Sequence, residues 1–185
     1  MIYYEKLIKI RGISNMKYCD NEYLNEKPEV VNILMNTAIN FSSLSKCAAK
    51  KVCCILYKDG NIISLGINGT SPGSVNCEDK FKKVNGQWYI KNPFDPLSAW
   101  ELCDDECHHE WSLYNEVHAE INAISKALVP VAGSVAIVTH SPCWNCAKSF
   151  VAFGISKVYY KYKYDDFDNV NNYLKMQGID LIQVN

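Results

Sequence analysis

The chain has 185 residues, of which 48% are hydrophobic and 21% charged, and its formal net charge is −1 at pH 7. This composition is that of an ordinary globular domain, and it excludes a disordered tail, a collagen-like rod and a coiled coil. The near-neutral charge argues against a protein that coats nucleic acid. No apolar run reaches the roughly 18–20 residues that a membrane helix needs, so no membrane partner is expected.

The first ten residues are too charged and too interrupted to form a secretory signal. We therefore expect a cytoplasmic protein, in the host cytoplasm if the chain is viral. Its nine cysteines are then expected to be reduced thiols and not a disulfide framework. All four histidines lie between His108 and His140. In a chain with reduced thiols, clustered cysteine and histidine residues indicate metal binding more often than disulfide bonds.

Residues 1–27 show no clear periodicity, and we expect them to form an N-terminal extension of uncertain structure. A single domain is predicted over residues 28–185. It contains a long polar insertion at about residues 78–111. Long structureless loops are uncommon within a compact domain, so this insertion is expected to be functional or held in place locally.

The rest of the chain alternates between helix and strand patterns. Pro28 opens a helical pattern, and Lys58-Asp59-Gly60-Asn61 is typical of a hairpin turn between two apolar strands. Further helices are predicted at residues 118–128, 143–153 and 167–176. Strands are predicted at residues 52–57, 62–67, 134–139, 155–160 and 179–182. This order predicts an α/β fold with one sheet and helices packed on its faces.

Two short motifs carry candidate zinc ligands, and each falls at the start of a predicted helix. They are His118-Ala119-Glu120 and Pro142-Cys143-Trp144-Asn145-Cys146. Cys143 and Cys146 are three residues apart, so one helical turn places both sulfur atoms on one side, where the helix N-terminus favours thiolates. Together with His118 they make three protein ligands. A tetrahedral zinc ion then keeps one open position, which is the mark of a catalytic site.

Glu120 lies two residues beyond His118, beside that open position. Zinc lowers the pKa of a bound water from about 15.7 toward roughly 7. A neighbouring carboxylate can take and return protons during attack by this water. A non-catalytic zinc scaffold is the competing interpretation, and Glu120 speaks against it because a structural zinc site has no open position to serve.

His-x-Glu followed by Pro-Cys-x-x-Cys is the signature of zinc deaminases. About residues 30–182 resemble the cytidine deaminase-like superfamily and, within it, the deoxycytidylate (dCMP) deaminases of T-even bacteriophages. The segments that carry the resemblance are Ser45-Lys46-Cys47, Lys58–Ser64, Asn68–Gly73, Val75-Asn76-Cys77, Glu110-Trp111-Ser112, Asn115–Glu120, Ser141-Pro142-Cys143 and Tyr164-Asp165. The resemblance implies a three-layer α/β/α fold, with about five strands in a mixed sheet and helices on both faces.

The resemblance also implies an activity, the hydrolysis of dCMP to dUMP and ammonia, which supplies dUMP for dTMP synthesis. Zinc hydroxide would attack C4 of cytosine, while Glu120 relays a proton to ring N3 and then to the leaving amino group. The implied substrate contacts are Asn68 for the sugar, Ser141, and Tyr164 near the nucleotide. The phosphate contacts cannot be carried over, because Ala49, Lys50 and Lys51 stand where many relatives have arginine; Lys161 and Lys163 are candidates.

A second, structural zinc is a further implication of the resemblance. Its ligand positions fall on Cys47, Cys77, His109 and Glu116. Four protein ligands leave no open position, and such a site would tie the insertion to the rest of the domain. Cys103, Cys107 and His108 are alternatives that could replace one of the four, although we favour buried or incidental side chains for them.

Regulation and assembly are implied in the same way. Relatives are often homo-oligomers, specifically hexamers, that dCTP activates together with Mg²⁺ and that dTTP inhibits. Their effector site corresponds to the loop Asn68-Gly69-Thr70-Ser71-Pro72-Gly73. Other substrates stay open: dCTP, deoxycytidine or a modified dCMP. A deaminase of single-stranded DNA or tRNA is the other alternative, but it should show a basic groove that this composition lacks.

Overall fold

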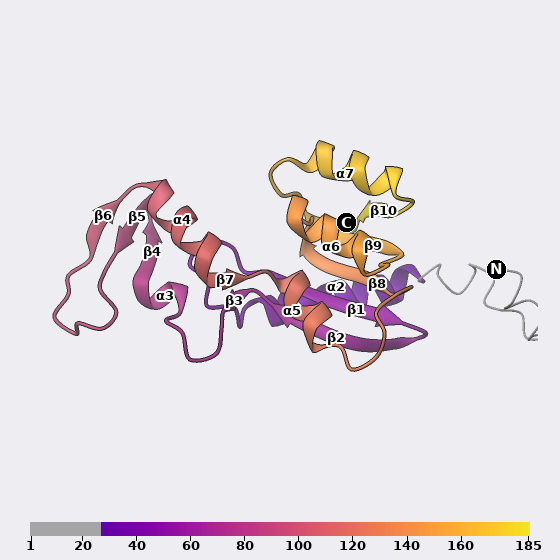
Figure 1. Ribbon diagram of the computed structural model, residues 1–185, viewed down its shortest axis with the longest axis horizontal. Helices are drawn as coiled ribbons and strands as arrows, with labels where there is room; N and C mark the ends of the chain where they lie inside the picture. The colour runs from indigo at the N-terminus through magenta and orange to yellow at the C-terminus, as the bar shows by residue number, and fades with distance from the viewer. Residues whose placement is uncertain (1–26) are drawn as a thin grey trace, which may run out of the picture.

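The computed structural model describes residues 27–185, so the predicted N-terminal extension lies outside the described residues except for Lys27. A five-stranded sheet with the order β10-β9-β8-β1-β2 forms the centre of the fold (Figure 1). The strands are β1 (Cys53–Lys58), β2 (Asn61–Ile67), β8 (Val135–His140), β9 (Lys157–Tyr162) and β10 (Asp180–Gln183). β1 pairs antiparallel with β2 and β8, whereas β8, β9 and β10 run parallel. The predicted mixed sheet is confirmed.

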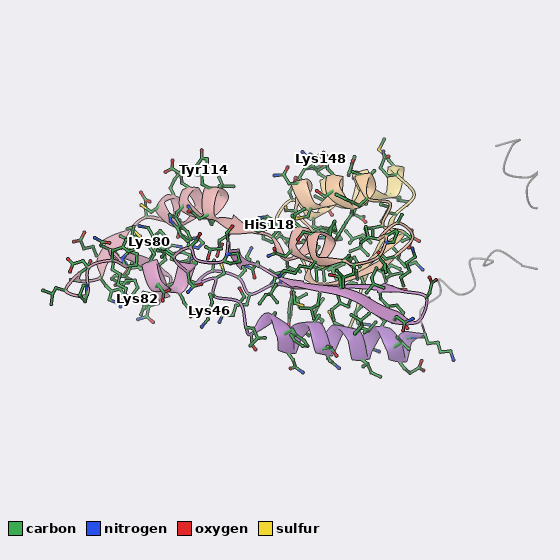
Figure 2. All side chains as sticks on the ribbon, turned by 60° about the horizontal axis from the view of Figure 1, so that its bottom comes forward. Lys46, Lys80, Lys82, Tyr114, His118 and Lys148 are labelled. Carbon is green, nitrogen blue, oxygen red and sulfur yellow. The ribbon has the colours of Figure 1, made fainter. Side chains whose placement is uncertain are left out.

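Helices cover both faces of this sheet, which confirms the three-layer α/β/α architecture. α2 (Pro28–Ser42) packs on one face, against β1, β8 and β9. The opposite face carries α5 (Ala119–Lys126), α6 (Trp144–Ala152) and α7 (Phe167–Met176). Figure 2 shows α2 alone on its side of the sheet, with the other three helices across from it.

β1 is a central strand with both faces covered, and its sequence reflects this. Cys53 and Ile55 pack with α2, while Cys54 and Leu56 pack toward α5 and α6. All four side chains are fully buried. A strand with both faces buried has no polar alternation, which is why Cys53 to Leu56 form a continuous apolar run.

α5 lies unusually close to β2, and Gly66 makes this approach feasible. A Cβ atom at Gly66 would overlap the backbone of Ala119 and Ala123 in α5. Glycine is the residue that permits such close backbone packing. Since α5 begins directly after His118 and carries Glu120 in its first turn, Gly66 sets where these two candidate site residues stand.

The predicted insertion is folded and extends beyond one end of the main sheet (Figure 1). It contains α3 (Cys77–Lys80), β4 (Phe81–Val84), β5 (Gln87–Ile90), β6 (Glu101–Cys103) and α4 (Asp105–Asn115). Its three strands form an antiparallel sheet in the order β4-β5-β6. The sequence did not predict these strands, because three or four residues are too few to establish a period of two.

A second small pairing joins the insertion to the main body. β3 (Gly69–Thr70) pairs antiparallel with β7 (Glu116–Val117), the segment immediately before His118. In the described part of the chain, no helix is both long and apolar enough to cross a membrane.

Candidate active site

Three zinc-competent side chains meet at the carboxyl end of β8. His118 is the N-cap residue of α5, Cys143 is the N-cap residue of α6, and Cys146 lies in the first turn of α6. The Nδ1 atom of His118 lies 3.3 Å from Sγ of Cys146 and 3.4 Å from Sγ of Cys143. The three predicted ligands therefore come together as the sequence indicated.

The spacing of these three donor atoms fits a zinc ion. Zinc bonds of about 2.3 Å to sulfur and about 2.0–2.1 Å to nitrogen at a tetrahedral angle separate the two ligand atoms by about 3.6 Å. The observed separations of 3.3 and 3.4 Å are close to that value. Cys146 is buried while His118 is exposed, so the group is closed on its protein side and open toward the cleft described below.

The thiol of Cys143 suits a cation as well. Hydrogen bonding from Cys146 and His118 lowers the pKa of the Cys143 thiol to about 4. Its thiolate in turn raises the pKa of His118 to about 9. A thiolate is the form of cysteine that binds metal, so Cys143 is prepared to act as a ligand at neutral pH.

Glu120 stands beside these ligands in the first turn of α5. Its side chain is only 5% exposed, and burial raises the pKa of its carboxyl group. It forms no salt bridge with any of the described residues. A buried carboxyl group with a raised pKa can hold a proton and release it again, which is what general acid–base chemistry requires.

A cleft of about 400 Å³ gives access to this group. Its walls come from both the main body and the insertion, and they include His118, Glu120 and Cys143. The three predicted substrate contacts also line it: Asn68, Ser141 and Tyr164.

Ser141 and Asn68 have backbone partners in the structure. Ser141 is buried, and its Oγ accepts a hydrogen bond of 2.8 Å from the backbone N–H of Tyr164. The side chain of Asn68 accepts from the N–H of Val52 and donates to the carbonyl of Lys50. Both residues therefore hold the chain that forms the cleft wall.

A second cluster of donors lies where the insertion meets the main body. Its members are Cys47, Cys77, His108 and Glu116. Sγ of Cys77 lies 3.3 Å from Nε2 of His108, and Sγ of Cys47 lies 3.3 Å from Oε2 of Glu116. Three of the four predicted structural ligands are thus brought together, but His109 is not among them and is corrected here to His108.

The direction of the two histidines on α4 explains this correction. His108 is 7% exposed, and its ring stacks on Trp88 at 4.1 Å and 10°. Consecutive helical residues point about 100° apart, so His109 faces away from this buried side and is exposed. His108 is buried, as favoured from the sequence, and its ring nitrogen also lies among the donor atoms of this cluster. The signal that could have identified it is its place on the apolar side of α4, which it shares with Trp111.

Burial leaves one carboxyl oxygen of this second cluster without a partner. Oε1 of Glu116 is buried and has no hydrogen-bond partner, which is costly for a carboxylate. Burial and the Cys47 charge raise the pKa of Glu116 to about 8, while hydrogen bonding from Cys77 lowers the pKa of Cys47 to about 3. Two sulfurs, one imidazole and one carboxylate are a donor set that fits zinc with no open position.

Comparison with known proteins identifies the family. The sequence model of the cytidine and deoxycytidylate deaminase zinc-binding region matches residues 28–162. The chain belongs to this deaminase family. The deoxycytidylate deaminase of Enterobacteria phage T2 is 33% identical over 171 residues, which cover 82% of this chain and 90% of the phage protein.

Solved structures of related deaminases agree with the fold. The dCMP deaminase of cyanophage S-TIM5, crystallised with dCMP and dUMP, is 31% identical with a TM-score of 0.62, and the match covers 85% of this chain and 98% of that chain. A diaminohydroxyphosphoribosylaminopyrimidine deaminase from Thermotoga maritima has a TM-score of 0.54 at 18% identity, covering 84% of this chain and 36% of that one. The latter shows a shared fold alone.

Several other predicted residues lie away from the deaminase cleft. Of the loop Asn68–Gly73, only Asn68 is among the cleft-lining residues. Lys161 and Lys163, the phosphate candidates, do not line the cleft either, and Nζ of Lys163 lies 4.6 Å from the Phe167 ring centre. Cys103 and Cys107 pack at the margin of the insertion core, outside both donor clusters.

Among the cleft residues with no role assigned from sequence are Lys50 and His140. Both line the cleft wall, and Nζ of Lys50 lies 4.0 Å from the Tyr164 ring centre. Lys50 follows the Ser-Lys-Cys segment in a loop without periodicity, and His140 ends β8, so neither position carries a motif.

Proposed function

We propose that this chain is a zinc-dependent deaminase that converts dCMP and water to dUMP and ammonia, and so supplies dUMP for dTMP synthesis. The observation that carries the proposal is Glu120, a buried carboxyl group in the same cleft as a three-ligand metal site. The phage T2 relative and the cyanophage protein crystallised with dCMP and dUMP support dCMP as the substrate.

His118, Cys143 and Cys146 would hold the catalytic zinc, which when bound supplies a water of lowered pKa. The protein's own part in the chemistry is proton transfer at the Glu120 carboxylate. Its raised pKa lets Glu120 take one proton from the attacking water and deliver it to N3. Glu120 then takes the second proton from the hydroxyl group on C4 and delivers it to the amino group, which leaves as ammonia. Ser141 orients Tyr164 through the backbone hydrogen bond, and Tyr164 closes the cleft beside the nucleotide.

The competing substrates are separable by charge. Single-stranded DNA or tRNA would call for a basic groove with stacking aromatics, whereas the chain has a net charge of −1 and the cleft has both acidic and basic walls. A free nucleotide needs only a small cavity with a few polar contacts. The cleft therefore favours a nucleotide over a polynucleotide.

A second, structural zinc belongs to the proposal. We assign it to Cys47, Cys77, His108 and Glu116, and the orphaned Oε1 of Glu116 supports the assignment. The ion would join the loop before β1 to both ends of the insertion, a long closure that the small insertion core alone hardly stabilises.

Regulation and assembly complete the proposal. We infer dCTP activation with Mg²⁺, dTTP inhibition and a homo-hexamer in the cytoplasm from the phage-type resemblance. The pairing of β3 with β7 supports coupling, because it links the loop that follows Asn68 to the two residues before the ligand His118. An effector that moves this loop would act on the start of α5.

The test is an ammonia-release assay over dCMP, dCTP, deoxycytidine, a 5-modified dCMP and single-stranded DNA, with and without dCTP and dTTP. We expect dCMP to react fastest. Glu120→Gln should keep its zinc but lose about 10²- to 10⁴-fold in rate, the usual contribution of a general acid–base.

Glu110→Gln is the matched control, since Glu110 is exposed on α4 and does not line the cleft. It should retain the wild-type rate. A Glu120→Gln variant with more than about a tenth of the wild-type rate would remove Glu120 from the proton relay.

A further inference from the structure

One lysine reaches the cleft from the loop that precedes β1. Lys50 lines the cleft together with Glu120 and Tyr164. Its Nζ lies 4.0 Å from the centre of the Tyr164 ring and 3.5 Å from Oδ2 of Asp165. The Lys50 side chain is 44% exposed. Its ammonium group is therefore accessible to a ligand in the cleft.

The loop that carries Lys50 is fixed by the backbone contacts of Asn68. Nδ2 of Asn68 donates to the carbonyl of Lys50 at 2.9 Å, and Oδ1 accepts from the N–H of Val52 at 2.8 Å. The backbone N–H of Asn68 donates to the carbonyl of Val52 at 3.1 Å. Three hydrogen bonds around Lys51 hold a segment that belongs to no helix or strand, so Lys50 starts from a defined position.

Lys50 is also one of the two lysines that line the cleft. His140 lines the same wall, and its burial together with the Lys50 charge lowers the pKa of its imidazole, which leaves the ring neutral at pH 7. The other lysine of the cleft, Lys83, lies 3.6 Å from Asp105 and 5.0 Å from the Trp88 ring centre, at the second donor cluster.

We propose that Lys50 binds the 5′-phosphate of the substrate and so makes the enzyme select a nucleoside monophosphate over a nucleoside. The inference rests on the proposed function, because the phosphate belongs to dCMP. A phosphate monoester carries nearly two negative charges and forms its strongest hydrogen bonds with cationic donors. It replaces Asp165 on the ammonium group, and Asp165 yields readily because its side chain is 88% exposed.

Tyr164 keeps the lysine in place during this exchange. The ammonium group lies over the tyrosine ring, and a cation–π contact holds the side chain over the cleft without occupying its hydrogen-bond donors.

The experiment compares kcat/KM for dCMP and for deoxycytidine in the wild type and in Lys50→Gln, Lys50→Arg and Lys51→Gln. Lys51 is the matched control, because it is the next residue but points to the carbonyl of Ser43 and does not line the cleft. Lys50→Gln should lower kcat/KM for dCMP by about 10- to 100-fold, the loss expected for one charge-assisted hydrogen bond, mainly through KM.

The same variant should change kcat/KM for deoxycytidine by less than about twofold, and Lys50→Arg should recover most of the dCMP activity, because arginine also binds phosphate. Equal losses on both substrates, or an equal effect of Lys51→Gln, would overturn the proposal. The proposal would also be overturned if Lys83→Gln lowered kcat/KM for dCMP selectively and Lys50→Gln did not, because the phosphate would then bind at the insertion.

A binding measurement separates this proposal from the proposed function. Calorimetry with dUMP and deoxyuridine should show that Lys50→Gln weakens only dUMP, whether or not turnover is observed. A wild type that binds dUMP but releases no ammonia from any cytosine substrate contradicts the deaminase function alone. Unchanged dUMP binding in Lys50→Gln contradicts the role of Lys50 alone.

Discussion

Replacing His108 by phenylalanine separates metal binding from packing at the second donor cluster. Phenylalanine keeps a ring against Trp88 and Phe81 but has no nitrogen to offer to a metal ion. In the structure the His108 ring stacks on Trp88 at 4.1 Å and meets Phe81 edge-on at 5.3 Å. The variant should therefore bind about one zinc ion per chain where the wild type binds about two.

His108→Ala supplies the magnitude of the packing contribution. It removes both ring contacts as well as the ligand, and each such contact is worth about 0.5–1.5 kcal/mol, so together they contribute about 1–3 kcal/mol. At about 2–4 °C per kcal/mol for a chain of this size, His108→Ala should melt about 2–12 °C below His108→Phe. Both variants should have lost the same zinc ion.

Atomic absorption of the dialysed protein and a thermal melt followed by circular dichroism provide the two readouts. His109→Phe is the matched control, since His109 is exposed and lies outside the cluster. It should keep its full zinc content and its Tm. The assignment fails if His108→Phe retains the second zinc ion, or if His109→Phe loses one.

Two further variants test the main body. Cys146→Ala should lose the catalytic zinc ion and all turnover, whereas Cys103→Ala should keep both, because of these two cysteines only Cys146 belongs to a donor cluster. Full zinc content in Cys146→Ala would disprove the assignment of Cys146 as a ligand. Gly66→Ala should lower the free energy of unfolding by about 1–3 kcal/mol, and the Tm by about 2–12 °C, because the new Cβ meets the backbone of α5. The variant should also reduce turnover, because a shift of α5 displaces Glu120. An unchanged melt and rate would show that α5 can shift without cost.

The main sheet and the meeting of His118, Cys143 and Cys146 could be predicted because their signals are local. The turn Lys58–Asn61 lies between two apolar strands, and Cys143 and Cys146 share one helical turn. His118 and Glu120 belong to one three-residue segment at a helix start. Each signal spans only a few residues, so it can be recognised from the sequence without knowing the fold.

The insertion and the second cluster depend on contacts between distant segments. Choosing His108 over His109 required knowing which side of α4 packs on Trp88, and the fold alone decides this. The position of Lys50 is fixed by a hydrogen bond from the side-chain amide of Asn68, 18 residues away, and no periodicity of helices or strands relates the two residues. Residues whose roles depend on such long-range contacts can be identified only from the three-dimensional structure.

The second donor cluster draws its members from both flanks of the insertion, with Cys47 and Cys77 on one side and His108 and Glu116 on the other. The segment between Cys77 and His108 can therefore differ in length or sequence among descendants of this protein, provided that its two ends return to the same donor cluster. Such exchange would reshape the outer wall of the cleft, and with it the range of ligands admitted, while Glu120 stayed where it is.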